Sequence, residues 1–286
     1  MDDARLGALL VLVSATGFGT LGVLGIVAGD AGLSIPTVLF FRFALATVLV
    51  WGLLYARGQL RRLRGRNLVV GIGLGALGYA AMSGFYFLGL EFMTAGMVGI
   101  VLYTYPAFVL VLAAAFLGEP IDRRTLFALG ATLGGVALIT GADPAAADPR
   151  GVGIVLVAAV VYATYITVSR TALHEVSAPT LTAHVMPAAA ASFFVVGMAT
   201  DTLAMPQGAV AWGAVVGIAV LATAVPIFAF FAGLSRIGAG PAAILSAVEP
   251  VVTVALGALF LAEPVSAVLV VGGGLVVLGV VVVPRR

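Results

Sequence analysis

Residues 87–120 read FLGLEFMTAGMVGIVLYTYPAFVLVLAAAFLGEP, and residues 231–264 read FAGLSRIGAGPAAILSAVEPVVTVALGALFLAEP. The two stretches align without gaps, and 13 of the 34 positions are identical. Each is long and apolar enough to contain a membrane-spanning helix, which needs about 20 apolar residues. The pair therefore predicts a membrane protein with an internal repeat at an offset of 144 residues.

The composition of the whole chain agrees with a membrane location. Of its 286 residues, 62% are hydrophobic and only 9% are charged, and the mean hydropathy is +1.22. These values lie far outside the range of soluble domains. We predict an all-α integral membrane protein with ten transmembrane helices, the first of them retained rather than cleaved as a signal peptide. The expected helices span 6–28, 37–55, 67–90, 94–117, 123–141, 151–169, 180–200, 209–234, 240–260 and 264–283.

The repeat divides these helices into two groups of five. Residues 1–142 form the first expected half and residues 150–286 the second. Because five is an odd number, the second half must enter the membrane from the opposite face, which makes the repeat inverted. Inverted halves can exchange which side of the membrane is open while a solute is held between them. The pattern therefore predicts alternating access.

The arginines set the expected orientation. All 14 basic residues are arginine, and all but Arg42 and Arg150 fall on one side if the N-terminus is cytoplasmic. Cytoplasmic loops carry the excess of positive charge, so both termini are expected in the cytoplasm of a multi-pass plasma membrane protein. The arginines are scattered among short loops, so no nucleic-acid partner is expected.

Two prolines occupy equivalent places in the repeat. Pro106 and Pro250 each lie about halfway along an expected helix, where proline removes a backbone donor and can kink the helix. A single proline in a membrane helix is usually a packing feature, but two symmetric ones favour a functional break. We predict hinges at both positions.

Glu249 is the only carboxylate expected deep in the bilayer, where an ionised side chain is costly. With Ser246 and Thr253 it forms an i, i+3, i+7 set on one face of an apolar helix, and this face is expected to line a cavity. Glu249 could bind and release a proton or pair with a substrate ammonium. The alternative is a protonated carboxyl that only hydrogen-bonds a neighbouring helix.

Further pocket residues are suggested by aromatic side chains with polar tips at helical spacing. Arg42 is closer to a helix end, and its guanidinium is expected to snorkel to the headgroups rather than bind substrate. The expected substrate-binding residues beyond helix 9 are Tyr79, Ser83, Tyr86, Tyr103, Tyr105, Tyr162 and Tyr165.

Several other kinds of site are not expected. The chain has no cysteine, and neither His174 nor His184 has an acidic residue at metal-ligand spacing. Residues 73–78 match G-x-G-x-x-G inside an apolar span rather than after a strand, so no nucleotide or other cofactor is expected. Glycine pairs at four-residue spacing, such as Gly71 with Gly75 and Gly130 with Gly134, instead predict close helix packing.

At these residues the sequence resembles the EamA family of the drug/metabolite transporter superfamily. The matching pieces are FFRFALATVLV (40–50), VLYTYPAFVLVLAAAFLGEP (101–120), ILSAVEPVVTVALGALFLAEP (244–264) and the glycine-rich fifth and tenth helices. The resemblance implies two five-helix repeats with a proline in the fourth helix of each. It also implies export or exchange of amino acids or other small metabolites, driven by protons or by the solute's own gradient. The family's Gly-Glu turn is matched by Gly118 and Glu119, with Glu263 as its counterpart, and by depth these residues suggest capping.

The predicted function is therefore a secondary-active or facilitative carrier with a small-molecule solute, membrane lipids and protons as expected partners. The oligomeric state cannot be read from the pattern. One alternative is a membrane-embedded enzyme acting on lipid or isoprenoid intermediates, which would need Glu249, His184 and Arg42 to converge. Another is a sensor that binds a solute without moving it.

Overall fold

The computed structural model describes residues 2–93, 95–141, 148–260 and 265–283, and within these ranges the chain is helical with no strand. Most expected helices are present with ends shifted by a few residues. The expected boundary between the halves, at residues 142–150, falls mostly outside the described ranges. The first half contains α1 (Asp3–Asp30), α2 (Ile35–Ala56), α3 (Gly65–Gly73), η1 (Leu74–Tyr79), α4 (Ala80–Gly89), α5 (Ala95–Leu102), α6 (Tyr105–Leu117) and α7 (Arg123–Ile139). The second half contains α8 (Pro149–Ala172), α9 (Ala178–Ala199), α10 (Gly208–Ala219), η3 (Val220–Ala224), α11 (Val225–Ile237), α12 (Ala239–Ser246), α13 (Glu249–Phe260) and α14 (Ala267–Val282).

Short polar side chains cap the N-termini of several helices by accepting hydrogen bonds from backbone N–H groups in the first turn. Ser34 caps α2 by accepting from Thr37 N, and Asp122 caps α7 by accepting from Thr125 N at 2.8 Å. At the other end of a helix, Gly118 terminates α6 in the left-handed region with φ 67°, a conformation that glycine adopts without strain. These local signals explain why the helix ends follow the sequence so closely.

Eight helical stretches among the described residues are long and apolar enough to cross a membrane. Four of these stretches are composite, namely Gly65–Gly89, Met97–Leu117, Gly208–Ile237 and Ala239–Phe260. The expected fifth and tenth helices correspond to α7 and α14, which have 17 and 16 residues. The protein is thus a multi-pass, all-helical membrane protein.

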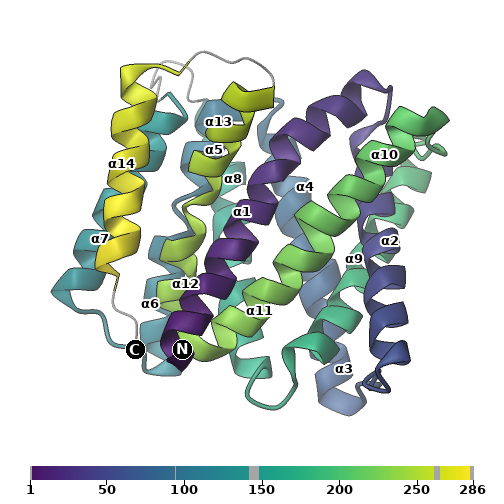
Figure 1. Ribbon diagram of the computed structural model, residues 1–286, viewed down its shortest axis with the longest axis horizontal. Coiled ribbons are helices and arrows are strands. Elements are labelled where there is room, and N and C mark those ends of the chain that lie inside the picture. The colour runs from purple at the N-terminus through teal and green to yellow at the C-terminus, as the bar shows by residue number, and fades with distance from the viewer. Residues whose placement is uncertain (1, 94, 142–147, 261–264, 284–286) are drawn as a thin grey trace.

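The two halves pack crosswise (Figure 1). Helix α1 lies against α11 and α13 of the second half, and α8 lies against α4, α5 and α6 of the first. Helix α2 pairs with α9 at one flank, and α7 pairs with α14 at the other. Each first helix therefore contacts the third and fourth helices of the other half, as a pseudo-two-fold relation requires.

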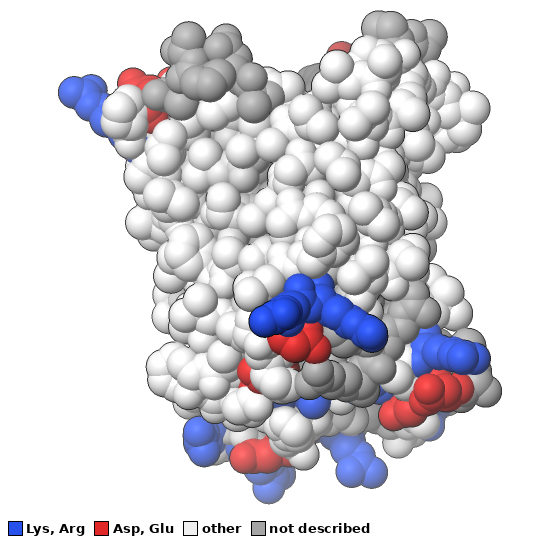
Figure 2. Space-filling view, turned by 90° about the vertical axis from the view of Figure 1, so that its left-hand side faces the viewer, with Lys and Arg blue, Asp and Glu red and all other residues white. Residues whose placement is uncertain are grey.

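Charge is unevenly distributed along the long axis of the helices. Figure 1 shows both termini at its lower end, and Figure 2 shows most arginine side chains gathered toward the same end. Between the two ends, most of the surface in that view carries neither acidic nor basic side chains. Large hydrophobic side chains are exposed along the helices, for example Val48, Leu77 and Phe116. This pattern fits an apolar girdle facing lipid tails.

Close helix packing depends on other glycines than those expected. Gly130 and Gly134 face open space. The α7–α14 contact instead rests on Gly135 and Gly272, each of which lies against the other's carbonyl, so that an added Cβ would meet that oxygen at 2.5 and 2.8 Å. The four-residue spacing predicted close packing correctly for Gly75, which abuts the Val185 carbonyl, but it did not identify the contacting face of α7.

Gly272→Leu is expected to destabilise the protein by about 1–3 kcal/mol, because the added side chain forces two backbones apart. Thermal unfolding of the detergent-solubilised protein measures the effect. Gly274→Leu is the matched control on the same helix, since a Cβ there meets nothing within 4 Å. Equal unfolding temperatures for the two variants would contradict the packing argument.

Candidate functional site

A cavity of about 590 Å³ lies between the two halves. It is lined by α1, α2, η1, α4, α5, α6, α7, α8 and α13 and extends to Gly29, Leu33 and Ile35, at the α1–α2 connection. The α1–α2 connection is at the end of the molecule opposite to the two termini (Figure 1). The volume of the cavity lies in the range of small-molecule binding sites.

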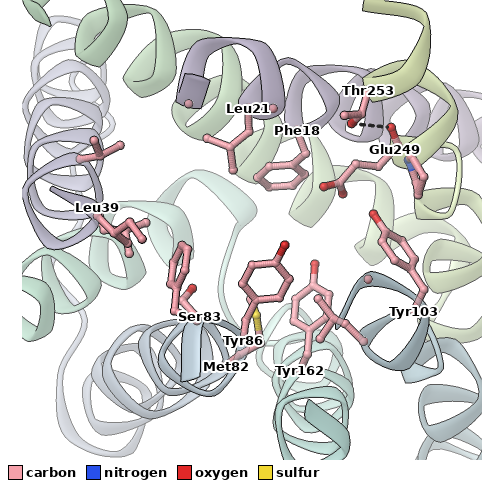
Figure 3. A pocket seen from close by; sticks show the side chains of 18 of the residues that line it. Phe18, Leu21, Leu39, Met82, Ser83, Tyr86, Tyr103, Tyr162, Glu249 and Thr253 are labelled. Atoms are coloured by element: carbon pink, nitrogen blue, oxygen red, sulfur yellow. Dashed lines mark hydrogen bonds between the residues drawn. The ribbon is translucent and has the colours of Figure 1, made fainter. Parts of the chain in front are cut away.

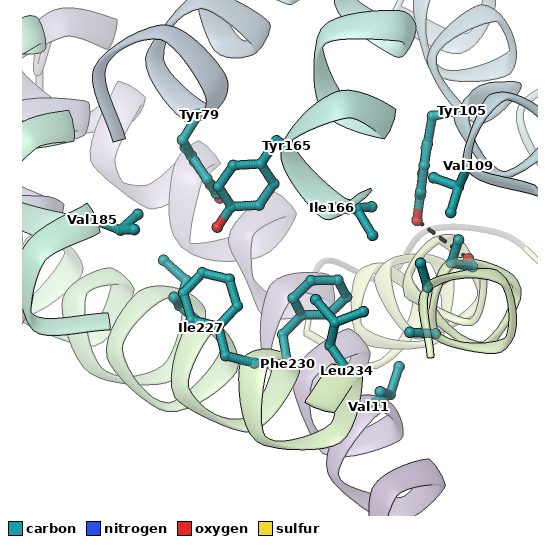
Figure 4. Packing of buried hydrophobic residues seen from close by; sticks show 14 of the residues in the cluster. Val11, Tyr79, Tyr105, Val109, Tyr165, Ile166, Val185, Ile227, Phe230 and Leu234 are labelled. Atoms are coloured by element: carbon teal, nitrogen blue, oxygen red, sulfur yellow. Dashed lines mark hydrogen bonds between the residues drawn. The ribbon is translucent and has the colours of Figure 1, made fainter. Parts of the chain in front are cut away.

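Buried hydrophobic side chains pack tightly on the side of the cavity nearer the termini (Figure 4), where Val11 precedes the cavity-lining Phe18 along α1. Val11, Val109 and Leu234 are fully buried in this cluster, and the Tyr105 hydroxyl donates to Ala243 O at 3.4 Å. A solute in the cavity would therefore reach one end of the protein but not the other.

Most of the expected binding residues surround this cavity. Pro250 also lines it, whereas Pro106 does not. Tyr165 lies behind the wall, against Tyr79, Tyr162 and Phe231. Ser246 is buried and donates to Ala242 O at 2.9 Å. The expected residues that line the cavity are Tyr79, Ser83, Tyr86, Tyr103, Tyr105, Tyr162, Glu249 and Thr253.

The tyrosines form a connected wall. The rings of Tyr105 and Tyr162 are 4.6 Å apart between centroids, and Tyr103 and Tyr105 are 5.9 Å apart. Figure 3 shows Tyr86, Tyr103 and Tyr162 presenting their hydroxyls to the cavity. The wall therefore offers ring faces to apolar groups and hydroxyls to polar ones.

The two prolines mark helix breaks. Residues 103–104 separate α5 from α6, and residues 247–248 separate α12 from α13. Pro106 and Pro250 are each the second residue of the helix that follows the break, a position where the missing N–H is tolerated. The chain therefore interrupts the helix just before each proline, rather than kinking a continuous helix at it.

Glu249 begins α13, and its carboxylate projects into the cavity near the Tyr103 hydroxyl (Figure 3). Thr253, one turn later, donates to Glu249 O at 3.1 Å and contacts Gly19 O of α1 at 3.2 Å. No described residue forms an ion pair with Glu249. Ser246 lies before the break at residues 247–248 and does not line the cavity, whereas Glu249 lies after the break and does.

Arg42 does not snorkel, contrary to expectation. It is only 2% exposed and lines the cavity. Its Nε donates to Thr223 Oγ1 at 3.0 Å, and its Nη2 donates to Ala222 O at 3.1 Å and to the Tyr79 hydroxyl at 3.4 Å. Two π-helical segments, η1 and η3, supply these partners. A π-helical turn changes which carbonyls and side chains face inward, and here it turns Ala222 O toward the guanidinium.

Glu119 holds the closed end together. Its Oε1 accepts from Ala239 N at 2.8 Å, and its Oε2 accepts from Gly240 N at 3.0 Å. The carboxylate after α6 thus caps the N-terminus of α12 in the other half, which confirms the capping interpretation and adds its partner. Glu263 lies outside the described residues. A smaller pocket of about 200 Å³ surrounds Glu119 at this end.

The charges of the cavity occupy non-equivalent positions in the two halves. Tyr105 is the repeat counterpart of Glu249. Helices α2 and α9 both start at a Ser-x-Pro sequence, Ser34–Pro36 and Ser177–Pro179, and counting from these starts pairs Arg42 with Val185. The first half therefore contributes the cation and the second half the anion.

His184 has a structural place away from the cavity. Its Nδ1 lies 2.8 Å from Thr180 O, and its Nε2 accepts from Leu63 N at 3.2 Å, which ties the arginine-rich α2–α3 connection to α9. Over the described part of the chain, no group of three or more metal-ligating side chains occurs.

Fold and cavity together define a multi-pass membrane protein with a solute-sized cavity between two similar halves. The chain belongs to the EamA-like transporter family, whose model matches twice, over residues 5–141 and 149–284, and which is part of the drug/metabolite transporter superfamily. It is 29% identical to the "Uncharacterized transporter YcbK" of Bacillus subtilis (strain 168), over 95% of this chain and 90% of the relative. It is 28% identical to an "Uncharacterized transporter" of Archaeoglobus fulgidus, over 86% and 87% of the two chains.

The fold also matches a solved crystal structure with a TM-score of 0.84. The match covers 96% of this chain and 95% of the solved one at 22% sequence identity. Family and relatives indicate a transporter rather than an enzyme.

Proposed function

We propose that the protein is a secondary-active or facilitative carrier that exports or exchanges small metabolites such as amino acids by alternating access. The observation that carries this proposal is the cavity between the two halves, open toward one end and closed at the other by side-chain packing. A one-sided cavity at a repeat interface is the arrangement that a rocking-type carrier needs.

The proposal includes the topology. Ten membrane crossings, counted with α7 and α14, give two inverted halves of residues 1–142 and 150–286 with both termini in the cytoplasm of the plasma membrane. The gathering of arginines at the end that holds the termini supports this orientation. In this orientation the cavity faces outward, and the cluster around Tyr105 and Ala243 is the cytoplasmic seal.

Each cavity group then has a role. Glu249 binds a substrate ammonium or a coupling proton, and Ser83, Thr253 and the tyrosines at the wall hydrogen-bond the solute. The breaks before Pro106 and Pro250 act as hinges, because an interrupted helix can bend without losing further backbone hydrogen bonds. Tyr165 and Ser246 support this wall from behind.

The rival enzyme hypothesis needs Glu249, His184 and Arg42 in one site. His184 is occupied by Thr180 and Leu63 at another part of the molecule and does not line the cavity. A sensor would use the same cavity as a carrier, so only flux separates these two hypotheses.

Counterflow into proteoliposomes tests the proposal. Vesicles preloaded in turn with amino acids, amines and nucleobases should show saturable exchange of one class, several-fold above protein-free vesicles, at pH values from about 5.5 to 8. Binding without exchange in correctly folded protein would favour the sensor and overturn the carrier.

A further inference from the structure

Arg42 is a buried cation that forms no salt bridge with any residue the structure describes. No described carboxylate lies within ion-pair distance of it, and the described acidic residue that shares its cavity, Glu249, is not paired with it. A charged side chain is rarely kept inside a membrane protein unless it is paired or faces a polar cavity. Glu249 supplies negative charge to the same cavity but does not lie within ion-pair distance of Arg42, so an anionic group that enters the cavity can contact the guanidinium directly.

The guanidinium is held in a fixed orientation. Nε and Nη2 are bonded to Thr223, Ala222 and Tyr79. The Thr223 hydroxyl is itself directed, because it donates to Ile218 O at 2.9 Å and so presents its lone pair to Nε. The Phe43 ring centroid lies 4.8 Å from the guanidinium carbon and restricts it further. Arg42 is thus preorganised on one edge of its fork.

The remaining edge is available to a ligand. Nη1 makes no hydrogen bond to any residue that the structure describes, and it is not fully buried. Since Arg42 lines the cavity, its Nη1 N–H groups are accessible from there. Guanidinium N–H groups match carboxylate oxygens in geometry and charge better than any other protein donor does.

The wall of the same cavity is apolar and aromatic. Phe18, Leu39, Met82 and Tyr86 project into it from α1, α2 and α4 (Figure 3). A solute with a carboxylate and a hydrophobic body would satisfy both the cation and this wall. Glu249, the acidic group of the same cavity, favours a solute that also carries an amine.

We infer that Arg42 is the carboxylate-binding residue of the cavity and that it selects zwitterionic solutes with apolar side groups over amines of the same shape. This inference rests on the proposed carrier function. Arg42 thus stabilises η3 through its bonds to Ala222 and Thr223, and it presents Nη1 to the solute.

The test uses three matched probes in counterflow and competition assays: L-phenylalanine, 3-phenylpropionate and 2-phenylethylamine. In the wild type, phenylalanine is expected to compete about 10- to 100-fold better than phenylethylamine, the range for one charge-assisted hydrogen-bond pair. In Arg42→Gln this ratio should fall close to one, and exchange of phenylpropionate should fall by a similar factor. Arg42→Lys should lie between them, because it keeps the charge and loses the fork.

The outcomes separate this inference from the carrier function. Exchange with the same phenylalanine-to-phenylethylamine ratio in wild type and Arg42→Gln overturns the role of Arg42 alone. No exchange of any probe by folded wild-type protein overturns the inference together with transport of this solute class. If Arg42→Gln does not fold, the wild-type competition ratio decides: equal competition by the acid-bearing and acid-free probes overturns the inference. A purely structural Arg42 would lower the unfolding temperature without changing the ratio.

Discussion

Glu119→Ala should open the end of the protein that carries the termini. The substitution removes both hydrogen bonds to the N-terminus of α12, where the helix dipole also favours the carboxylate. Loss of a helix N-cap costs about 0.5–2 kcal/mol. Because these hydrogen bonds hold the end closed, their loss should shift the equilibrium between the closed and open arrangements toward the open one by roughly 2- to 30-fold.

The chain contains no cysteine, so one introduced thiol reports this shift directly. Ala243→Cys places it at a fully buried position beside the Tyr105 hydroxyl. The rate at which maleimide labels this cysteine should rise roughly 2- to 30-fold when Glu119→Ala is added. Glu175→Ala removes an exposed charge outside this contact and serves as the control. An unchanged labelling rate in Glu119→Ala would show that the cap does not hold the seal.

Glu249→Gln is expected to have the largest effect on transport. The substitution keeps the shape of the side chain but removes the negative charge and the titrating proton. Exchange of ammonium-bearing solutes should fall about 10-fold or more, because a charge-assisted contact is replaced by a neutral one. Any dependence of the exchange rate on pH between about 5.5 and 8 should also disappear.

Other groups near this carboxyl do not account for such a pH response. The other titratable side chains of the cavity are arginine and tyrosine, residue types whose ordinary pKa values lie well above this range. The cavity groups concerned are Arg42, Tyr79, Tyr86, Tyr103, Tyr105 and Tyr162. Glu91→Gln, at an exposed position, is the matched control. A Glu249→Gln variant with wild-type rate and pH profile would mean that Glu249 only hydrogen-bonds its surroundings.

The sequence predicted the helices well because long apolar runs and capping residues are local signals. It also led to Glu249, since a lone carboxylate in an apolar run has few structural explanations. It misjudged Arg42 because α2 begins at Ile35, two residues earlier than expected, so that Arg42 lies deeper in the helix. The partners that hold Arg42 inward, Ala222 and Thr223, are about 180 residues away, and no local pattern connects them.

Two other site predictions assumed that helical spacing alone decides which side chains face the cavity. Ser246 and Glu249 would share a face only if the helix were continuous through residues 247–248, and the break there separates them. Tyr165 follows Tyr162 by three residues, yet it faces Phe231 rather than the cavity. The signal that was available for Arg42 was the absence of any acidic residue near it in α2, which leaves the charge to be satisfied from elsewhere.

The placement of Arg42 and Glu249 in different halves also bears on how such a chain can change over generations. Two copies of the first half would bring together two guanidinium groups and no carboxylate, and two copies of the second half would do the reverse. The presence of both signs of charge in the cavity thus requires both halves. Neither half could be replaced by a copy of the other without removing one sign of charge from the cavity lining.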